Sequence, residues 1–222
     1  IMKKIGVVLS GCGVYDGAEI HESVITLLAI DRAGAEAVCM APNVEQMHVV
    51  NHLTGEEAAG EKRNVLIESA RIARGEIKDI STVKADDIDA LVFPGGFGAA
   101  KNLSSFAVKG ENCDVHPEVL RLVKEFAAKQ KPQAVLCIAP AMMAKIYQDA
   151  PKKPVLTIGN DKETSGKIEL MGSRHQDCSA RDFVLDAENK IVSTPAYMLG
   201  QSISEVAEGI EKTINELIKL IP

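Results

Sequence analysis

The sequence predicts an α/β protein with a mostly parallel sheet and helices on both of its faces. Short apolar, β-branched runs alternate along the chain with longer segments whose apolar residues recur at helical spacing. Some of these runs lead straight into glycine or proline turns. The chain has 222 residues and shows no internal repeat or linker, so we expect one domain over residues 1–222.

The first half of the chain opens with a strand, a loop and a helix. Residues 4–9 are apolar and β-branched, residues 10–17 read as a loop, and residues 19–32 have a helical periodicity that ends before Gly34. A second short strand is expected over residues 36–41. The other elements expected in this half are a helix over 65–74 and a strand over 90–93.

The second half continues the alternation and ends in a long amphipathic helix. In chain order, we expect a helix (117–129), a strand (134–136), a helix (138–146), a strand (154–158), a hairpin (183–185 with 191–193) and a helix (202–220). Two stretches, 43–62 and 98–116, are polar or glycine-containing and longer than ordinary connections. Both follow strands, where open α/β sheets bind ligands, so we expect functional loops there.

Composition and charge exclude several classes of protein. Apolar residues make up 46% of the chain, and Lys plus Arg number 25 against 31 Asp plus Glu, so the formal net charge is −6. We therefore expect neither nucleic acid nor an anionic membrane as a partner. No apolar stretch is long enough for a membrane span, and the N-terminal residues do not resemble a signal peptide. Five cysteines without a C-x-x-C pair favour a reducing cytosol over a disulfide framework.

Cys137 is the strongest candidate for a reactive residue. It follows an apolar run and precedes a helical segment in which Pro140 fits the first turn. Cys137 would therefore stand on a strand-to-helix turn, where helix amides favour the thiolate. The geometry parallels a hydrolase nucleophile elbow without its flanking glycines. The alternative is an inert cysteine that packs as a small hydrophobe, and this segment alone does not decide between the two.

Two further features would complete a site around Cys137. Residues 93–98 (FPGGFG) place unhindered amides at a strand end, and those of Gly96 and Ile138 would form an oxyanion hole, unless the glycines only make a tight turn. Glu22, in the first turns of its helix, would project toward Cys137, although acidic residues there often only support the helix dipole. Glu19 is one turn earlier and competes for either role.

Other candidate motifs are weaker. Gly11 and Gly13 follow the first strand, but the third glycine of a dinucleotide fingerprint is one residue late, and the second strand lacks the acidic ribose ligand. Cys12 in this loop has no visible activator. His175 and Cys178 form H-x-x-C without a second ligand pair, so no metal site is expected. None of the five histidines is adjacent to Cys137 in the sequence.

Five motifs in order resemble one family over nearly the whole chain. The matching stretches are 11–22 (GCGVYDGAEIHE), 51–56 (NHLTGE), 94–103 (PGGFGAAKNL), 137–141 (CIAPA) and 194–198 (TPAYM). Together they are similar to the ElbB-like glyoxalase and enhancing-lycopene-biosynthesis family, within the PfpI-like class I glutamine-amidotransferase-like superfamily.

This resemblance implies a flavodoxin-like three-layer sandwich that is usually dimeric. It implies that Cys137 pairs with a glutamate from the first helix, and the match selects Glu22 rather than Glu19. It also implies that Gly96 supplies the oxyanion amide. The chain departs from the superfamily in two places: Ile138 replaces a histidine of the PfpI-like proteases, and residues 194–198 replace the His-x-Glu of the amidotransferases. Peptide and glutamine hydrolysis are therefore discounted.

The activity that the resemblance implies is that of a cofactor-independent, cysteine-dependent glyoxalase III-like lyase. It would convert glyoxal to glycolate, which fits an attacking Cys137 and a proton shuttle at Glu22, with a broader protein deglycase role as an extension. We expect the Glu22 pKa to be raised and the sulfur to hold the negative charge. The alternative is a non-enzymatic, redox-responsive or partner-binding protein linked to isoprenoid biosynthesis, and a third option is an amidotransferase-type subunit.

Overall fold

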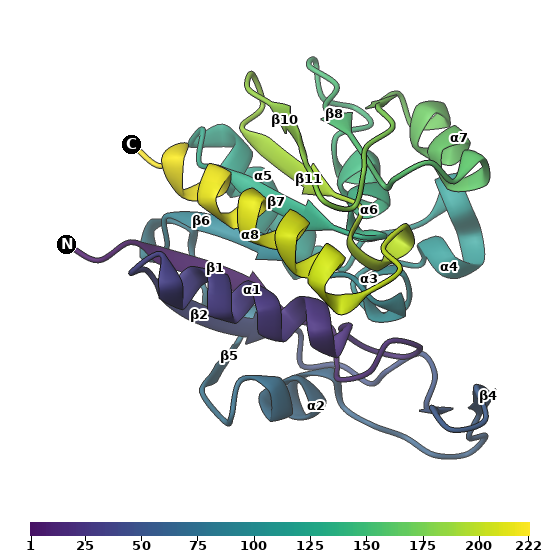
Figure 1. The fold of residues 1–222 in the computed structure, drawn as a ribbon. Helices are drawn as coiled ribbons and strands as arrows, with labels where there is room; N and C mark the ends of the chain where they lie inside the picture. The colour runs from purple at the N-terminus through teal and green to yellow at the C-terminus, as the bar shows by residue number, and fades with distance from the viewer.

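A seven-stranded sheet runs through the middle of the molecule (Figure 1). In the computed structural model, which describes residues 1–222, its strand order is β10-β11-β7-β6-β1-β2-β5. Only β10 is antiparallel to its neighbour. The strands are β1 (Lys4–Val8), β2 (Glu36–Ala41), β5 (Ile77–Asp79), β6 (Ala90–Phe93), β7 (Gln133–Leu136), β10 (Val184–Asp186) and β11 (Ile191–Thr194). The predicted α/β class with a mostly parallel sheet is confirmed.

Helices cover both faces of this sheet and bury a separate apolar cluster on each (Figure 1). One face is covered by α1 (Ile20–Arg32), α2 (Val65–Ile72) and α8 (Ile203–Lys219). The other is covered by α3 (Phe97–Lys101), α4 (Phe106–Lys109), α5 (Pro117–Ala128), α6 (Ala139–Ile146) and α7 (Lys162–Leu170). Short 3-10 turns occur at Ile80–Thr82, Ala85–Asp87, Gly110–Asn112 and Ala196–Met198. None of the helices combines the length and apolar composition that crossing a bilayer requires.

The main elements form for reasons visible in the sequence. All four residues of β6 are buried, as expected of a central parallel strand with helices on both faces. In α8, buried Val206, Ile210, Ile214 and Leu217 recur at helical spacing, and Ser202 caps the helix through its hydroxyl oxygen. Each such apolar side chain contributes about 1.5–3 kcal/mol when it leaves water.

Several elements differ from the prediction. The strands β5 and β9 (Arg174–His175) and the helix α7 were not expected, and α2 ends two residues before the predicted Arg74. The predicted strand at 154–158 is shorter (β8, Val155–Leu156), and it pairs with β9 in a separate two-stranded sheet. These segments have few or no consecutive apolar residues, so periodicity does not reveal them.

The two stretches predicted as long loops contain short regular elements. Residues 43–62 hold the antiparallel ribbon of β3 (Val50–Asn51) and β4 (Glu56–Glu57). Residues 98–116 hold most of α3, all of α4 and a 3-10 turn, so an unstructured loop there was the wrong expectation. Residues of both stretches line cavities.

Candidate active site

The site lies where several parallel strands end at the same edge of the sheet. The segments that follow β1, β6, β7 and β11 meet there. They are held together by backbone hydrogen bonds, including Glu19 N–H to the Gly95 carbonyl (2.9 Å) and Cys137 N–H to the Thr194 carbonyl (3.0 Å). This is the edge at which open α/β sheets bind ligands.

Cys137 occupies a strained turn between β7 and α6. Its φ of +61° lies in the left-handed region, which costs a non-glycine residue about 1–3 kcal/mol in the most constrained sites. Only 7% of the residue is exposed, and it forms part of the wall of a cavity of about 320 Å³. The predicted strand-to-helix turn is therefore present, and the sulfur reaches a cavity.

Glu22 is fully buried in the first turn of α1 and lies within hydrogen-bonding reach of Cys137. Its Oε1 accepts from the Gly95 N–H at 2.9 Å, and its Oε2 accepts from the Tyr197 N–H at 3.2 Å. Two backbone donors from different segments thus fix the carboxyl in one orientation. Of the two acidic residues, Glu22 is therefore the one that contacts the sulfur of Cys137.

Glu19 has a different role. It is the N-cap of α1, and its Oε2 accepts from the Glu22 N–H at 2.7 Å. This bond satisfies one of the free amides of the first helical turn. Glu19 also borders the Cys137 cavity, so a second carboxylate lies close to the reactive pair.

The amides of Gly96 and Ile138 both approach the sulfur of Cys137 and lower its pKa, although other effects outweigh theirs. The backbone at Gly96 requires glycine, since its φ is +92° and an added Cβ would lie 2.4 Å from the Glu19 nitrogen. Two converging amides beside a nucleophile are the arrangement that an oxyanion hole needs.

The electrostatics of the pair differ from the expectation that the sulfur holds the charge. Burial, followed by the Glu22 carboxylate, raises the pKa of Cys137 well above its usual 9.0. Burial, followed by Glu19, raises the pKa of Glu22 from 4.5 to about 7. The raised Glu22 pKa agrees with the prediction, but a preformed thiolate was the wrong expectation, because one buried charge is already held by the carboxylate and its two amides.

The rest of the cavity wall is mostly apolar. Phe97, Phe106 and Met198 contribute side chains, together with Tyr197, whose hydroxyl lies 2.7 Å from Nδ1 of His21. None of the five histidines borders the cavity. His175 accepts from the Ile158 N–H at 3.1 Å instead. Thr164 completes the wall from α7, a helix too polar to be recognised in the sequence.

Comparison with known proteins places this geometry in a family. No family model matches the chain. A human protein, glutamine amidotransferase-like class 1 domain-containing protein 3, mitochondrial, is 43% identical over 226 residues, which cover 98% of this chain and 83% of that protein. The chain belongs to the glutamine amidotransferase-like class 1 family. The zebrafish ES1 protein, mitochondrial, is 33% identical over 87% of this chain and 76% of its own.

Solved structures support the same assignment. The isoprenoid biosynthesis protein with an amidotransferase-like domain from Ehrlichia chaffeensis is 39% identical, with a TM-score of 0.90 over 97% of this chain and 99% of that one. Drosophila melanogaster DJ-1beta is 16% identical, with a TM-score of 0.58 over 99% of this chain and 96% of its own, and shares the fold. This member of the amidotransferase-like family therefore has the α/β fold seen in DJ-1-like and PfpI-like proteins.

Proposed function

We propose that the protein is a cofactor-independent glyoxalase that converts glyoxal to glycolate. The observation that carries the proposal is the buried contact between the Glu22 carboxyl and Cys137 at the edge of a cavity, beside the amides of Gly96 and Ile138. It supplies a nucleophile, a base with a pKa near neutrality and donors for a developing oxyanion. A broader deglycase role is an extension of the proposal, since a cavity of about 320 Å³ has room for dicarbonyl compounds larger than glyoxal.

The first step forms the bond between sulfur and carbon. Glu22, as the carboxylate, takes the thiol proton of Cys137 while the sulfur attacks one aldehyde carbon. The oxygen of that aldehyde becomes an oxyanion held by the two amides, and it then receives the proton from Glu22. The product is a hemithioacetal, and the carboxylate is regenerated.

The second step moves hydrogen between the two carbons. Glu22 removes the C–H proton of the hemithioacetal carbon, which gives an enediolate. A proton then moves from the hemithioacetal hydroxyl to the neighbouring oxygen, and Glu22 returns the proton that it holds to the neighbouring carbon. One carbon is thereby oxidised and the other reduced, so no external oxidant is needed. Water then cleaves the resulting thioester, releasing glycolate and the free thiol of Cys137.

The same geometry argues against amide hydrolysis. An aldehyde is far more electrophilic than an amide, so the reaction tolerates the lack of a histidine at the position of Ile138. A leaving amine would need a general acid that Thr194–Met198 does not supply in place of a His-x-Glu motif.

The test is glyoxal turnover by Cys137→Ala, followed by NMR detection of glycolate in heavy water. We expect loss of turnover with the fold unchanged by circular dichroism. Undiminished turnover would refute the proposal and favour the alternative, a non-catalytic partner of isoprenoid metabolism, the process named for the Ehrlichia relative. A redox-sensing role is less favoured, since burial keeps the thiol of Cys137 protonated and slows its oxidation.

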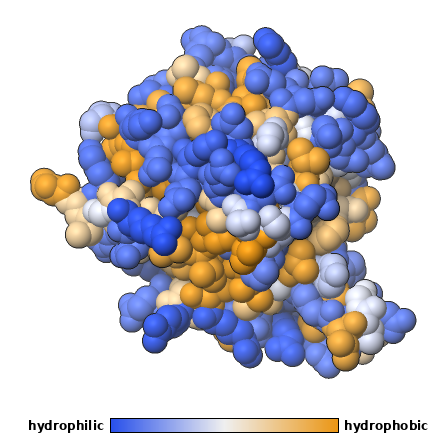
Figure 2. Space-filling view, viewed as in Figure 1, coloured by the Kyte–Doolittle hydropathy of each residue, from blue (hydrophilic) through white to orange (hydrophobic).

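We also propose that the protein is a homodimer. Ile20, Val24 and Leu28 form an exposed apolar stripe on α1, with a spacing of four residues. Figure 2 shows apolar surface gathered on the face where α1 lies. A contiguous apolar patch of this kind marks an association surface.

We further propose that the protein resides in a reducing compartment, because all five cysteines are free. The sequence leads us to expect the cytosol, whereas the human and zebrafish relatives are named as mitochondrial.

A further inference from the structure

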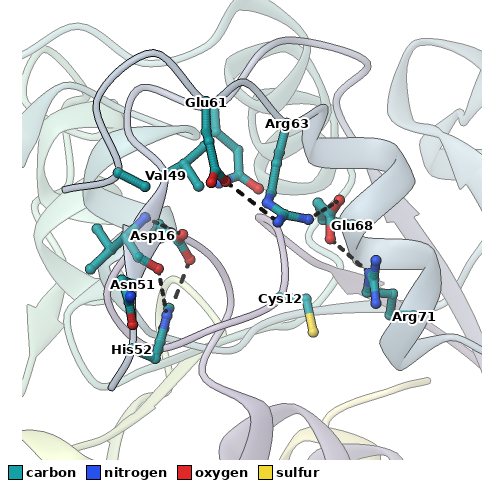
Figure 3. Close-up of a pocket in the computed structure, with 12 residues that line it drawn as sticks. Cys12, Asp16, Val49, Asn51, His52, Glu61, Arg63, Glu68 and Arg71 are labelled. Carbon is teal, nitrogen blue, oxygen red and sulfur yellow. Dashed lines mark hydrogen bonds and ion pairs between the residues drawn. The ribbon is translucent and has the colours of Figure 1, made fainter. Parts of the chain in front are cut away.

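A second cavity of about 400 Å³ lies beside the loop at residues 11–17 (Figure 3). It shares no wall residue with the Cys137 cavity, although the loop borders both, through Cys12 and Asp16 here and through Val14 there. The remaining walls come from residues 46–63 and from α2. The stretch predicted as a functional loop therefore encloses a site that the reaction at Cys137 does not use.

One wall of this cavity carries two guanidiniums and two carboxylates, and Arg63 Nη2 contacts Glu61 Oε2 at 3.7 Å. Arg71 Nε contacts Glu68 Oε2 at 2.8 Å, and Arg63 Nη1 contacts Glu68 Oε1 at 3.4 Å, so one nearly buried carboxylate orients two guanidiniums. Both Nη atoms of Arg71 lack a protein acceptor. Guanidinium groups with free, parallel N–H donors match the two oxygens of a carboxylate.

The opposite wall carries a carboxylate with one oxygen that receives no protein hydrogen bond. Asp16 is only 6% exposed, and its Oδ2 accepts from the Val50 N–H at 2.8 Å. Its Oδ1 has no donor within hydrogen-bond distance, since His52 Nε2 is 3.9 Å away and itself accepts from the Tyr15 N–H at 3.2 Å. Asp16 borders the cavity, so a ligand that brings a positive donor could pair with its Oδ1.

The two walls face each other across the cavity. Figure 3 shows Asp16 and His52 on one side and Arg63, Glu68 and Arg71 on the other, with Cys12 between them and Glu61 paired with Arg63. In total the walls contain two guanidiniums and three carboxylates, so neither a simple anion nor a simple cation is matched by both ends. We propose that this cavity binds a small zwitterion with separated charges, such as a short peptide, whose ammonium group faces Asp16 and whose carboxylate faces the free Nη atoms of Arg71.

The proposal is tested with three forms of the same small peptide. Trialanine, N-acetyl-trialanine and trialanine amide differ only in which terminal charge is present, and calorimetric titration of the 222-residue protein measures the affinity for each. We expect trialanine to bind at least roughly tenfold more tightly than either blocked form, since each blocking group removes one terminal charge together with its hydrogen bonds. Equal affinities, or no saturable binding of trialanine, would overturn the proposal.

Matched variants then locate the binding site. Arg71→Gln, at a side chain 65% exposed, is expected to weaken trialanine binding roughly tenfold and to leave the weak binding of the amide unchanged. Lys62→Gln removes the same charge from a side chain 75% exposed that does not border this cavity, and it should bind trialanine normally. An equal loss of trialanine affinity in both variants would indicate a general effect of charge and would overturn the assignment of the ligand to this cavity.

The anionic wall has its own test. Asp16→Asn keeps an acceptor for the Val50 N–H and should weaken trialanine roughly tenfold without affecting N-acetyl-trialanine. Because glyoxal turnover is measured separately, failure here does not bear on the function proposed for Cys137. An unchanged trialanine affinity in a folded Asp16→Asn protein would refute the assignment of the ammonium group.

Discussion

A Cβ atom added to Gly95 would lie 2.3 Å from the Cβ of Cys137 and 2.7 Å from the Glu22 carboxyl. The absence of a side chain at this position allows Cys137 and Glu22 to approach each other. The second glycine of the same turn is needed for another reason, namely the left-handed backbone at Gly96.

Gly95→Ala is therefore expected to disrupt the reactive pair. The methyl group must displace Cys137 or Glu22, so we predict that kcat/KM for glyoxal falls at least roughly 100-fold, as displacement of about 1 Å does at other sites. The matched control is Gly166→Ala, whose added Cβ meets no atom within 4 Å. Steady-state kinetics that show equal activity in both variants would contradict this reading of the site.

The rate of glyoxal turnover should rise with pH through the pKa of Glu22. The carboxylate form is the base in the first step, and burial raises its pKa to about 7. We predict that kcat/KM increases roughly tenfold per pH unit below pH 6 and levels off above pH 8. A profile that is already flat at pH 5 would instead mean that the sulfur holds the charge in the free enzyme.

Folding stability should also depend on the titration of Glu22, but it should fall, not rise, as the pH increases. The Glu22 pKa is 4.5 in the unfolded reference and about 7 in the folded protein, so the folded state binds more protons between these values. Stability then falls as pH rises from 4.5 to 7, by up to about 3 kcal/mol for this group alone. In Glu22→Gln that part of the pH dependence should be missing. Urea unfolding of both proteins at several pH values measures the free energy of unfolding. The same pH dependence in the wild type and in Glu22→Gln would refute the prediction.

Two helical glycines should respond in opposite directions to alanine. In α7, Gly166 faces open space, so Gly166→Ala should stabilise the protein by about 0.5–1 kcal/mol through helix propensity. In α8, a Cβ on Gly209 would lie 1.9 Å from the Ala180 carbonyl oxygen, so Gly209→Ala should destabilise by about 1–3 kcal/mol. Chemical unfolding compares them, and a stabilised Gly209→Ala would show that α8 is free to shift.

The homodimer proposal makes a prediction about the stripe on α1. Val24→Glu places a charge in its centre and should shift the protein toward a monomer, by at least roughly a tenfold weaker association. Ile67→Glu is the control, because Ile67 is similarly exposed on a different helix, α2. Light scattering after gel filtration measures both masses. A monomeric wild type, or an unchanged mass for Val24→Glu, would rule out this surface.

The fold was predictable where burial leaves a clear pattern. The strand over 36–41 and the strand over 90–93 have the predicted bounds, because central parallel strands are continuous apolar runs. Helix α7 was not predicted because Lys162–Leu170 is largely polar and contains Gly166. Strand β5 was not predicted because its three residues at the sheet edge are too few to show a periodic pattern.

The residues of the site were predictable, whereas their charges were not. Cys137 stands out by its place between a strand and a helix, and Gly96 by its neighbouring glycine. The protonation of the pair depends on how much water reaches it and on which backbone amides point at it. The amide of Tyr197, which fixes Glu22, comes from a distant segment that no local pattern connects to the first helix.

Glu22 and Tyr197 are separated by 175 positions, and the bond between them is made by a turn in which Ala196 has a φ of +45°. A growing chain on the ribosome therefore contains Cys137 and Glu22 before the last hydrogen-bond donor to Glu22 has been synthesised. If the proposed reaction is correct, its base is fixed in place only after the segment that carries Tyr197 has docked. A chain that ends before Tyr197 would leave the Glu22 carboxyl with one amide donor instead of two, and it would also lack α8 and the apolar side chains that this helix buries.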